Sequence, residues 1–192
     1  MDLKTGDTRL IIDTCKQHGL LRNQAAYVLA TAYHETAHTM KPVREMGGEK
    51  YLKSKAYYPY VGMGYVQLTW KRNYEKAGKK LGVDFVSNPK LLLEAKYAAP
   101  ILVIGSKEGW FTGKKLDDYI TIYRSDYVGA RRIINGTDRA TLIANHALAY
   151  DKLLKADGYG SIAHQPPPTV ETPAQGFWAS LFAAIAAMFG KK

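Results

Sequence analysis

One segment near the N-terminus leaves little choice of structure. Asn23–Met40, with the sequence NQAAYVLATAYHETAHTM, is rich in alanine and carries apolar side chains on almost every side until His34 and Glu35. A helix that is apolar nearly all round is stable only when other elements surround it. We therefore predict a buried helix, which Pro42 stops soon after these polar residues.

Apolar residues at helical spacing recur over most of the first 163 residues. Asp7 stands at the N-cap position of a short helix that ends near Gly19. Glycine, aromatic and β-branched residues over Tyr57–Thr69 favour a small sheet or an irregular loop. The sequence therefore predicts a mainly α fold with a small β element. The other predicted helices are Asn73–Leu81, Lys90–Lys107, Leu116–Ile122 and Arg139–Leu154.

Composition predicts one folded domain with a tail. The chain has 192 residues, of which 46% are hydrophobic, and its single cysteine, Cys15, excludes an internal disulfide and a cysteine-based zinc site. The N-terminus lacks the basic start and long apolar run of a secretory signal. Four prolines after Ala163 predict an extended linker. We therefore divide the chain into a domain over 1–163, a linker over 164–176 and an apolar segment over 177–192.

The charge balance points to an acidic partner. Lys and Arg number 27 against 17 Asp and Glu, a net charge of +10. Nucleic acid, an anionic membrane and a cell wall are all compatible with such a balance. Because no helix-turn-helix, RNP or zinc-finger signature is present, we expect no nucleic-acid partner.

The apolar segment has about 13 residues, Phe177–Phe189, followed by Gly190 and two lysines. A membrane-spanning helix needs about 20 residues, so this segment is too short to cross a bilayer. It suits a helix lying in the interface of an anionic membrane, although docking on its own domain or oligomerisation would also bury it. Its bulky face consists of Phe177, Trp178, Leu181, Phe182, Ile185 and Phe189.

The sequence HETAH at His34–His38 matches the zinc-protease pattern of two histidines four residues apart on a helix. Glu35 could then activate a zinc-bound water. A third zinc ligand would have to come from a residue such as Glu45 or Glu49, and no sequence pattern supports either of them as a ligand. We therefore expect no metal and no other cofactor.

A second interpretation pairs Glu35 with Glu45, ten residues later. Glu35 closes an apolar helix, where partial loss of hydration favours the protonated carboxyl group. Such an acid can protonate a glycosidic oxygen, while a second, ionised carboxylate across a cleft acts as base or nucleophile. Carboxylates alone do not distinguish this site from ordinary charges at a helix end.

The segment Tyr60–Tyr74, YVGMGYVQLTWKRNY, adds polar groups to this interpretation. Gln67 and Thr69 supply an amide and a hydroxyl, and Asn73 follows one helical turn later. These groups could hold a water or a sugar hydroxyl, with Tyr65 and Trp70 available for stacking on sugar rings. The pattern alone would also fit a structural hairpin.

Together these motifs resemble glycoside hydrolase family 19, and more narrowly its lysozyme-like branch in bacteriophage endolysins. The resemblance rests on HET at His34–Thr36, a glutamate about ten residues later, GxGYVQLTxxxNY, and RRIINGT at Arg131–Thr137. It covers roughly residues 20–155 in the order of the family. It implies an α-rich, two-lobed lysozyme-like fold and an inverting mechanism.

The resemblance also implies roles for single residues. Glu35 corresponds to the acid and Glu45 to the base, with Glu49 as the alternative base. Thr69 and Asn73 match positions that help to seat the nucleophilic water. The resemblance implies that Gln67 and Asn135 bind substrate. The polar and aromatic pattern of Tyr60–Tyr74 adds Asn73 and Tyr65 to the predicted substrate-binding residues.

The chain departs from the chitinase form of the pattern in several places. Ala37 and His38 stand where chitinases usually have Gly-Gly, Met63 stands where an arginine is common, and Tyr65 replaces a proline. We therefore expect an endolysin that is a muramidase of bacterial peptidoglycan, a monomer, held in the host cytoplasm until it reaches the wall. The alternatives are a chitinase using the same residues and a membrane-permeabilising protein acting through its tail.

Overall fold

The structure is a computed structural model that describes residues 1–160. The predicted linker, 164–176, and the apolar segment, 177–192, lie outside the described residues. Within residues 1–160, no helix is long and apolar enough to cross a membrane. The α-helices of this part are α1 (Thr8–Gln17), α2 (Arg22–Glu35), α3 (Glu49–Lys53), α4 (Lys71–Leu81), α5 (Ala95–Glu108), α6 (Tyr127–Ala130) and α7 (Ala140–Ala156).

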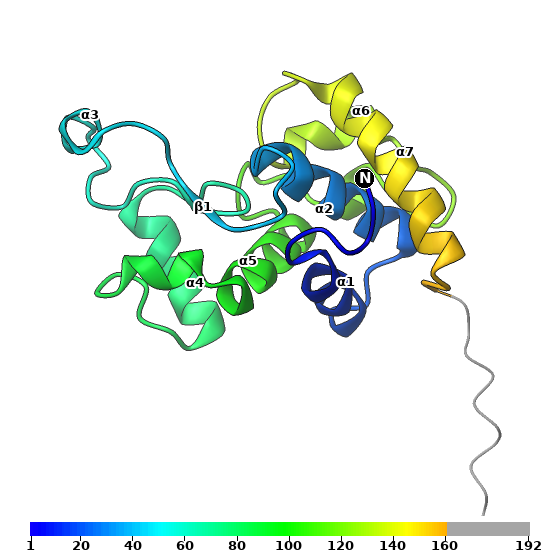
Figure 1. Cartoon of the computed structure of the whole chain (residues 1–192), viewed down its shortest axis with the longest axis horizontal. Coiled ribbons are helices and arrows are strands. Elements are labelled where there is room, and N and C mark those ends of the chain that lie inside the picture. The colour runs from blue at the N-terminus through cyan, green and yellow to red at the C-terminus, as the bar shows by residue number, and fades with distance from the viewer. Residues whose placement is uncertain (161–192) are drawn as a thin grey trace, which may run out of the picture. The chain divides into compact units, whose positions relative to one another are not determined.

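Helix α2 is the buried helix that the alanine-rich segment predicts. Residues 24–32 are all buried, and α7 and α1 pack against the helix (Figure 1). The Tyr27 hydroxyl donates a 2.7 Å hydrogen bond to the carbonyl oxygen of Ala130, which ties α2 to α6. Because these residues are shielded from solvent, the apolar side chains of α2 are buried on every side of the helix.

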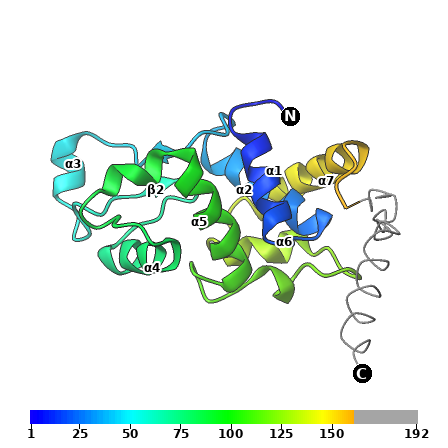
Figure 2. The same cartoon turned by 90° about the horizontal axis from the view of Figure 1, so that it is seen from below.

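Two separate hydrophobic cores divide the described part into two lobes. One core surrounds α2 and includes Ile12, Tyr150 and Leu102. The other packs α4 against the loops before it and includes Tyr74 and Phe85. Helix α5 lies between the two groups of elements in both cartoon views (Figures 1 and 2) and contributes to both cores. The predicted mainly α, two-lobed lysozyme-like fold is therefore confirmed.

The β element is a two-stranded antiparallel sheet of β1 (Val43–Arg44) and β2 (Met63–Gly64). Val43 lies opposite Gly64, and Arg44 lies opposite Met63. A tight turn then brings Leu68 back to Met63, with which it exchanges both backbone hydrogen bonds. Strand β2 falls inside the predicted β region, whereas β1 lies well before it.

Several predicted helices differ in length. The single helix predicted over Lys90–Lys107 is a 3-10 helix, η1 (Pro89–Leu93), followed by α5, because the backbone at Glu94 is extended. The helix predicted over Leu116–Ile122 is only the 3-10 turn η2 (Leu116–Asp118). Asp7 precedes α1 but its side chain does not cap the helix. A further 3-10 turn, η3 (Arg131–Ile133), follows α6.

Candidate active site

Glu35 is the last residue of α2, and a buried arginine holds it in place. Nη1 of Arg131, in η3, donates to Oε1 of Glu35 at 2.7 Å. The Arg131 side chain is 4% exposed and that of Glu35 is 21% exposed, so the ion pair is largely shielded from solvent. Nε of Arg131 also donates to the carbonyl oxygen of Asp138 at 3.0 Å, which fixes the guanidinium group.

Helix α2 ends at Glu35 because the next residues turn the chain. The buried Thr36 hydroxyl donates to the Ala32 carbonyl oxygen at 2.7 Å and accepts from the Met40 amide at 3.0 Å. Ala37 and His38 then adopt positive φ angles of 48° and 71°. The positions where chitinases usually have Gly-Gly are therefore left-handed here, a conformation that glycine adopts most easily.

This turn contradicts the zinc interpretation of HETAH. His38 lies beyond the end of α2, so its imidazole does not share a helical face with His34. Instead, its ring stacks on Tyr33 with centroids 4.1 Å apart. In the part of the chain that the structure describes, no three His, Cys, Asp or Glu side chains gather at a position that could hold a metal.

Glu45 directly follows β1 and is held at both carboxylate oxygens. The Tyr57 hydroxyl donates to Oε1 at 2.6 Å, and the Gly62 amide donates to Oε2 at 2.9 Å. The hydrogen bond to Glu45, together with burial, raises the pKa of Tyr57 to about 12. The alternative base, Glu49, begins α3, where it pairs with Arg44 at 2.7 Å and is 57% exposed.

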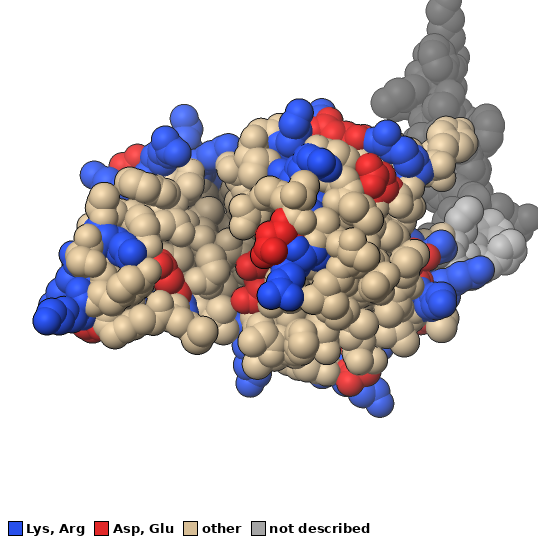
Figure 3. Space-filling view, turned by 90° about the horizontal axis from the view of Figure 1, so that it is seen from above, with Lys and Arg blue, Asp and Glu red and all other residues tan. Residues whose placement is uncertain are grey.

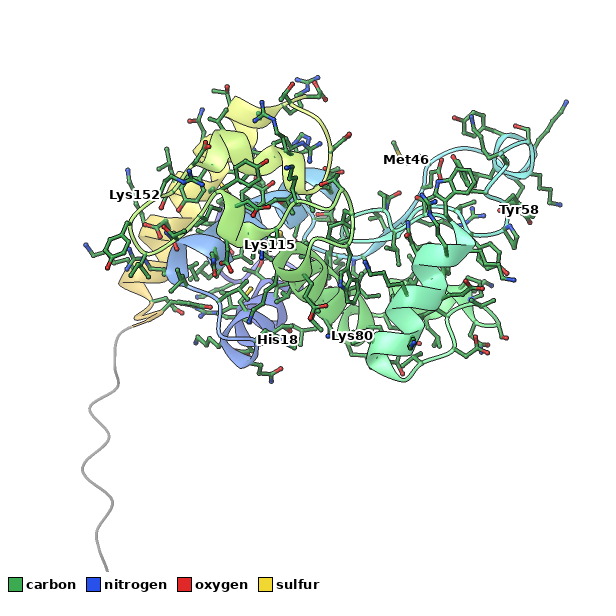
Figure 4. The ribbon with its side chains drawn as sticks, turned by 180° about the vertical axis from the view of Figure 1, so that it is seen from behind. His18, Met46, Tyr58, Lys80, Lys115 and Lys152 are labelled. Atoms are coloured by element: carbon green, nitrogen blue, oxygen red, sulfur yellow. The ribbon has the colours of Figure 1, made fainter. Side chains whose placement is uncertain are left out.

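A cavity of about 600 Å³ brings the two acidic regions together. One wall is the end of α2, including Glu35, and the other is formed by the residues on both sides of Glu45, Arg44 and Met46. Met46 is 91% exposed, and its side chain stands clear of the ribbon (Figure 4). Glu45 itself is not among the lining residues; its carboxylate is bound by Tyr57 and Gly62. An acid at such a cavity and a base close to it could act on a bond bound there.

Gln67 also lines this cavity, and its amide group fixes the adjacent strand. Nε2 of Gln67 donates to the Val43 carbonyl oxygen at 2.9 Å. A Cβ on Gly62 would lie 2.8 Å from Oε1 of Gln67, so only glycine fits there without displacing this side chain. The first glycine of the GxG motif therefore allows the close approach of Gln67.

Thr69 and Asn73 form a short hydrogen-bonded chain that ends at Gln67. The Thr69 hydroxyl donates to the Gln67 carbonyl oxygen at 2.7 Å, and Nδ2 of Asn73 donates to the Thr69 carbonyl oxygen at 2.7 Å. Both side chains are partly buried. The oxygen atoms of the Thr69 hydroxyl and the Asn73 amide remain able to accept a hydrogen bond.

The prediction that Tyr65 binds substrate is wrong. Its side chain is fully buried in the core around α2, and its hydroxyl donates to Oδ2 of Asp7 at 2.8 Å. A buried ring cannot stack on a sugar. Trp70, at 45% exposure, does offer a ring to solvent, and Asn135 is exposed in the loop after Arg131.

Two residues of the site have no predicted role, Arg131 and Tyr57. Arg131 belongs to the RRIINGT motif, but 96 positions separate it from Glu35, and no local spacing indicates their contact. Tyr57 is one of several tyrosines in the AYYPY segment, and nothing in the pattern distinguishes it from its neighbours.

The chain is similar in sequence to plant chitinases, although no family model matches it. The acidic endochitinase of Dioscorea japonica is 32% identical over 131 residues, which cover 64% of this chain and 50% of that protein. Chitinase 11 of Oryza sativa subsp. japonica is 56% identical over 34 residues, or 18% of this chain and 13% of the relative. The chain thus spans half the length, or less, of these curated relatives.

The solved structures that resemble the chain are also chitinases. Chitinase C from Streptomyces griseus HUT6037 superposes with a TM-score of 0.55 at 22% identity, covering 79% of this chain and 63% of that chain. A mutant of a chitinase C gives a TM-score of 0.50, also at 22% identity, and covers 79% and 77% of the two chains. At this identity the likeness concerns the fold, and the described residues have the fold of chitinase C.

Proposed function

We propose that this protein is a glycoside hydrolase that cuts β-1,4 bonds between N-acetylated sugars with inversion of configuration. The observation that carries the proposal is the 600 Å³ cavity, which is lined by Glu35 and by Arg44 and Met46, the two neighbours of Glu45 in the chain. An inverting enzyme needs two carboxyl groups on opposite sides of the bond, with room for a water between them. The chitinase fold and the sequence similarity to plant chitinases support the same reaction class.

In the proposed reaction, Glu35 is the general acid. Oε1 of Glu35 accepts from Arg131, whereas Oε2 receives no hydrogen bond from any residue in 1–160 and is the oxygen that carries the proton. Glu35 gives this proton to the glycosidic oxygen as the bond to the anomeric carbon breaks. The guanidinium group of Arg131 then stabilises the carboxylate that Glu35 becomes.

Glu45 is the general base of the same step. It takes a proton from a water that attacks the anomeric carbon on the face opposite the leaving group, which inverts the configuration. One O–H of this water points to Glu45, so the other would be accepted by the hydroxyl oxygen of Thr69 or by the amide oxygen of Asn73. Gln67 and Asn135 would bind the glycan. The two products are a new reducing end and a new non-reducing end.

Two candidate activities, a chitinase and a peptidoglycan muramidase, differ in the glycan that they cut. Similarity to chitinases supports chitin directly. Peptidoglycan, the substrate of an endolysin, is favoured by the net charge of +10 and by the departures at Ala37, His38 and Met63. In Figure 3, Lys and Arg side chains are spread over several parts of the molecule's face, which suits a long anionic wall polymer better than one small acidic ligand.

Product analysis decides between these candidates. Purified peptidoglycan and N-acetylglucosamine oligomers are each incubated with the protein and with Glu35→Gln, and the products are identified by mass spectrometry. New reducing ends on muramic acid would assign a muramidase, and shortened N-acetylglucosamine oligomers would assign a chitinase. If neither polymer is cut by the unaltered protein, the proposed activity is wrong.

A further inference from the structure

We propose that Tyr57 is a positioning residue that holds Glu45 in the orientation needed to take a proton from the attacking water. The inference rests on the proposed role of Glu45 as the base. Its structural basis is the 2.6 Å hydrogen bond that the Tyr57 hydroxyl donates to Oε1 of Glu45. Tyr57 lies outside both GxGYVQLTxxxNY and HET, so the motifs assign it no role.

The carboxylate of Glu45 is held by one donor at each oxygen. Tyr57 binds Oε1, and the Gly62 amide binds Oε2 at 2.9 Å. Each carboxylate oxygen can accept about two hydrogen bonds. One acceptor position on each oxygen therefore remains for water, and its direction is fixed by the donor on the same oxygen.

Contacts that do not involve Glu45 hold the Tyr57 ring in place. Its ring meets that of Trp70 edge to face, with centroids 5.5 Å apart and planes at 68°. The Tyr57 carbonyl oxygen accepts from the Tyr60 amide at 2.8 Å, and the Tyr60 carbonyl oxygen accepts from the Trp70 amide at 3.0 Å. The Tyr57 hydroxyl is thus held in place independently of Glu45, so the Tyr57 side chain does not have to be ordered during the reaction.

The Tyr57 hydroxyl is a hydrogen-bond donor at neutral pH. The hydrogen bond to Glu45, partial burial and the nearby Glu45 and Tyr51 raise the pKa of the hydroxyl to about 12. Its proton is therefore not transferred to Glu45 at neutral pH. This excludes a role as the acid or base and leaves the role of orienting the carboxylate.

A merely structural role for the hydroxyl is less consistent with the local hydrogen bonds. The backbone at Glu45 is held independently, because its amide donates to the Gly62 carbonyl oxygen at 2.6 Å and the preceding strand, β1, pairs with β2. Removing the Tyr57 hydroxyl leaves these bonds and the contact with Trp70 intact. We therefore expect Tyr57→Phe to fold normally.

The first test compares Tyr57→Phe with the unaltered protein on the glycan that product analysis identifies as substrate. We expect kcat to fall about 10- to 100-fold, the loss typical of one hydrogen bond to a charged group. KM should stay within about twofold, since in the proposed role this hydroxyl binds Glu45 and not the substrate. Tyr60→Phe is the matched control: its ring packs against Tyr74, and its hydroxyl donates to no group among the described residues. This control should keep the full kcat.

The second test is a double-mutant cycle with Glu45→Gln. If Tyr57 acts through Glu45, Tyr57→Phe should cause no further loss in the Glu45→Gln background. A second loss of the same size there, or an unchanged kcat in the single Tyr57→Phe variant, would overturn the inference while leaving Glu45 as the base. Full activity of Glu45→Gln would overturn the proposed base together with the inference.

Discussion

Among single residues, the pairing of Glu35 with Arg131 changes how the acid must work. The sequence predicts a carboxyl group kept protonated by apolar surroundings. The structure instead places a cation 2.7 Å from Oε1, with a side chain that is only 4% exposed. The arginine leaves one oxygen of Glu35 unbound, and it stabilises the charge that appears on Glu35 when the proton has been given to the leaving group.

Glu35→Gln should abolish hydrolysis and leave the fold intact. Glutamine has nearly the same shape, but it cannot donate the proton that general acid catalysis requires, so we expect a loss of at least about 100-fold in kcat. Reducing-end release measures the activity, and circular dichroism measures the helix content.

EDTA should have no effect on the hydrolytic activity of the unaltered protein. An activity that EDTA removes and zinc restores would return HETAH to consideration as a metal site.

Arg131→Met should destabilise the domain because it removes one partner of a shielded ion pair. Arg131 also donates to the Asp138 carbonyl oxygen, and partly buried acceptors left without their charged donor typically cost about 1–3 kcal/mol in the free energy of unfolding. Denaturant unfolding measures this quantity. Adding Glu35→Gln to Arg131→Met should recover part of the loss, because a neutral amide does not need a cation beside it. If the double variant is less stable than Arg131→Met, the ion pair does not account for the effect.

Tyr65 shows why residue roles are harder to predict than motifs. The alternating pattern around Gln67 indicates that neighbouring side chains point to different places, but it does not tell which of them faces the core. The hydroxyl of Tyr65 meets Asp7, 58 positions earlier in the chain. A contact of that kind depends on the packing of the N-terminal segment and leaves no local signal in the sequence.

Among the elements, helices whose core face is continuous in the sequence are predicted best. The apolar composition of α2 and the helical spacing in α4 and α7 identify these three helices. The ends of these helices are less predictable, because residues outside the apolar pattern determine them. Helix α2 ends at Glu35 because of the hydrogen bonds of Thr36 and the left-handed turn that follows it. The short elements α3, α6 and η3 have too few residues to show a period.

Gly78→Ala should weaken α4. A Cβ at Gly78 would lie 2.5 Å from the carbonyl oxygen of Val83, a backbone atom that can move only if the turn after the helix moves. Overpacking of this kind costs about 1–3 kcal/mol, which exceeds the gain of about 0.5–1 kcal/mol from replacing a helical glycine by alanine. Thermal unfolding measures the net loss. Gly48→Ala is the control, since a Cβ there would meet nothing within 4 Å. Equal stability of the two variants would contradict the predicted clash.

Across the described domain, the site depends on contacts that are distant in sequence. Glu35 is the last residue of α2, and Glu45 directly follows strand β1. Arg131 lies in η3, in the last quarter of the described domain. The motifs name candidate residues, because each motif is local, but they include the buried Tyr65 and leave out Tyr57. They do not predict the ion pair or the bond from Tyr57 to Glu45, because those arise only when the two lobes and the sheet have formed.

The last prediction concerns the full chain and its apolar segment, whose role we infer from sequence alone. A proline-rich linker, 164–176, separates this segment from every proposed catalytic residue, and its apolar side chains cannot supply an acid, a base or a ligand. Its bulky face, which includes Trp178 and Phe182, should partition into a lipid interface, and Lys191 and Lys192 should favour anionic head groups. The segment would then deliver the hydrolase without taking part in catalysis.

Truncation after Ala163 should therefore leave hydrolysis of purified glycan nearly unchanged, while leakage from anionic vesicles and killing of intact bacteria fall sharply. The matched control is the full chain with Phe182→Ser and Ile185→Ser, which keeps the length and the charge but loses the apolar face. It should behave like the truncated protein in the vesicle assay, because membrane partition depends on the buried apolar area. If truncation instead removes activity on isolated glycan or lowers the unfolding temperature of the domain, the segment is part of the folded enzyme. The proposed membrane role would then be wrong.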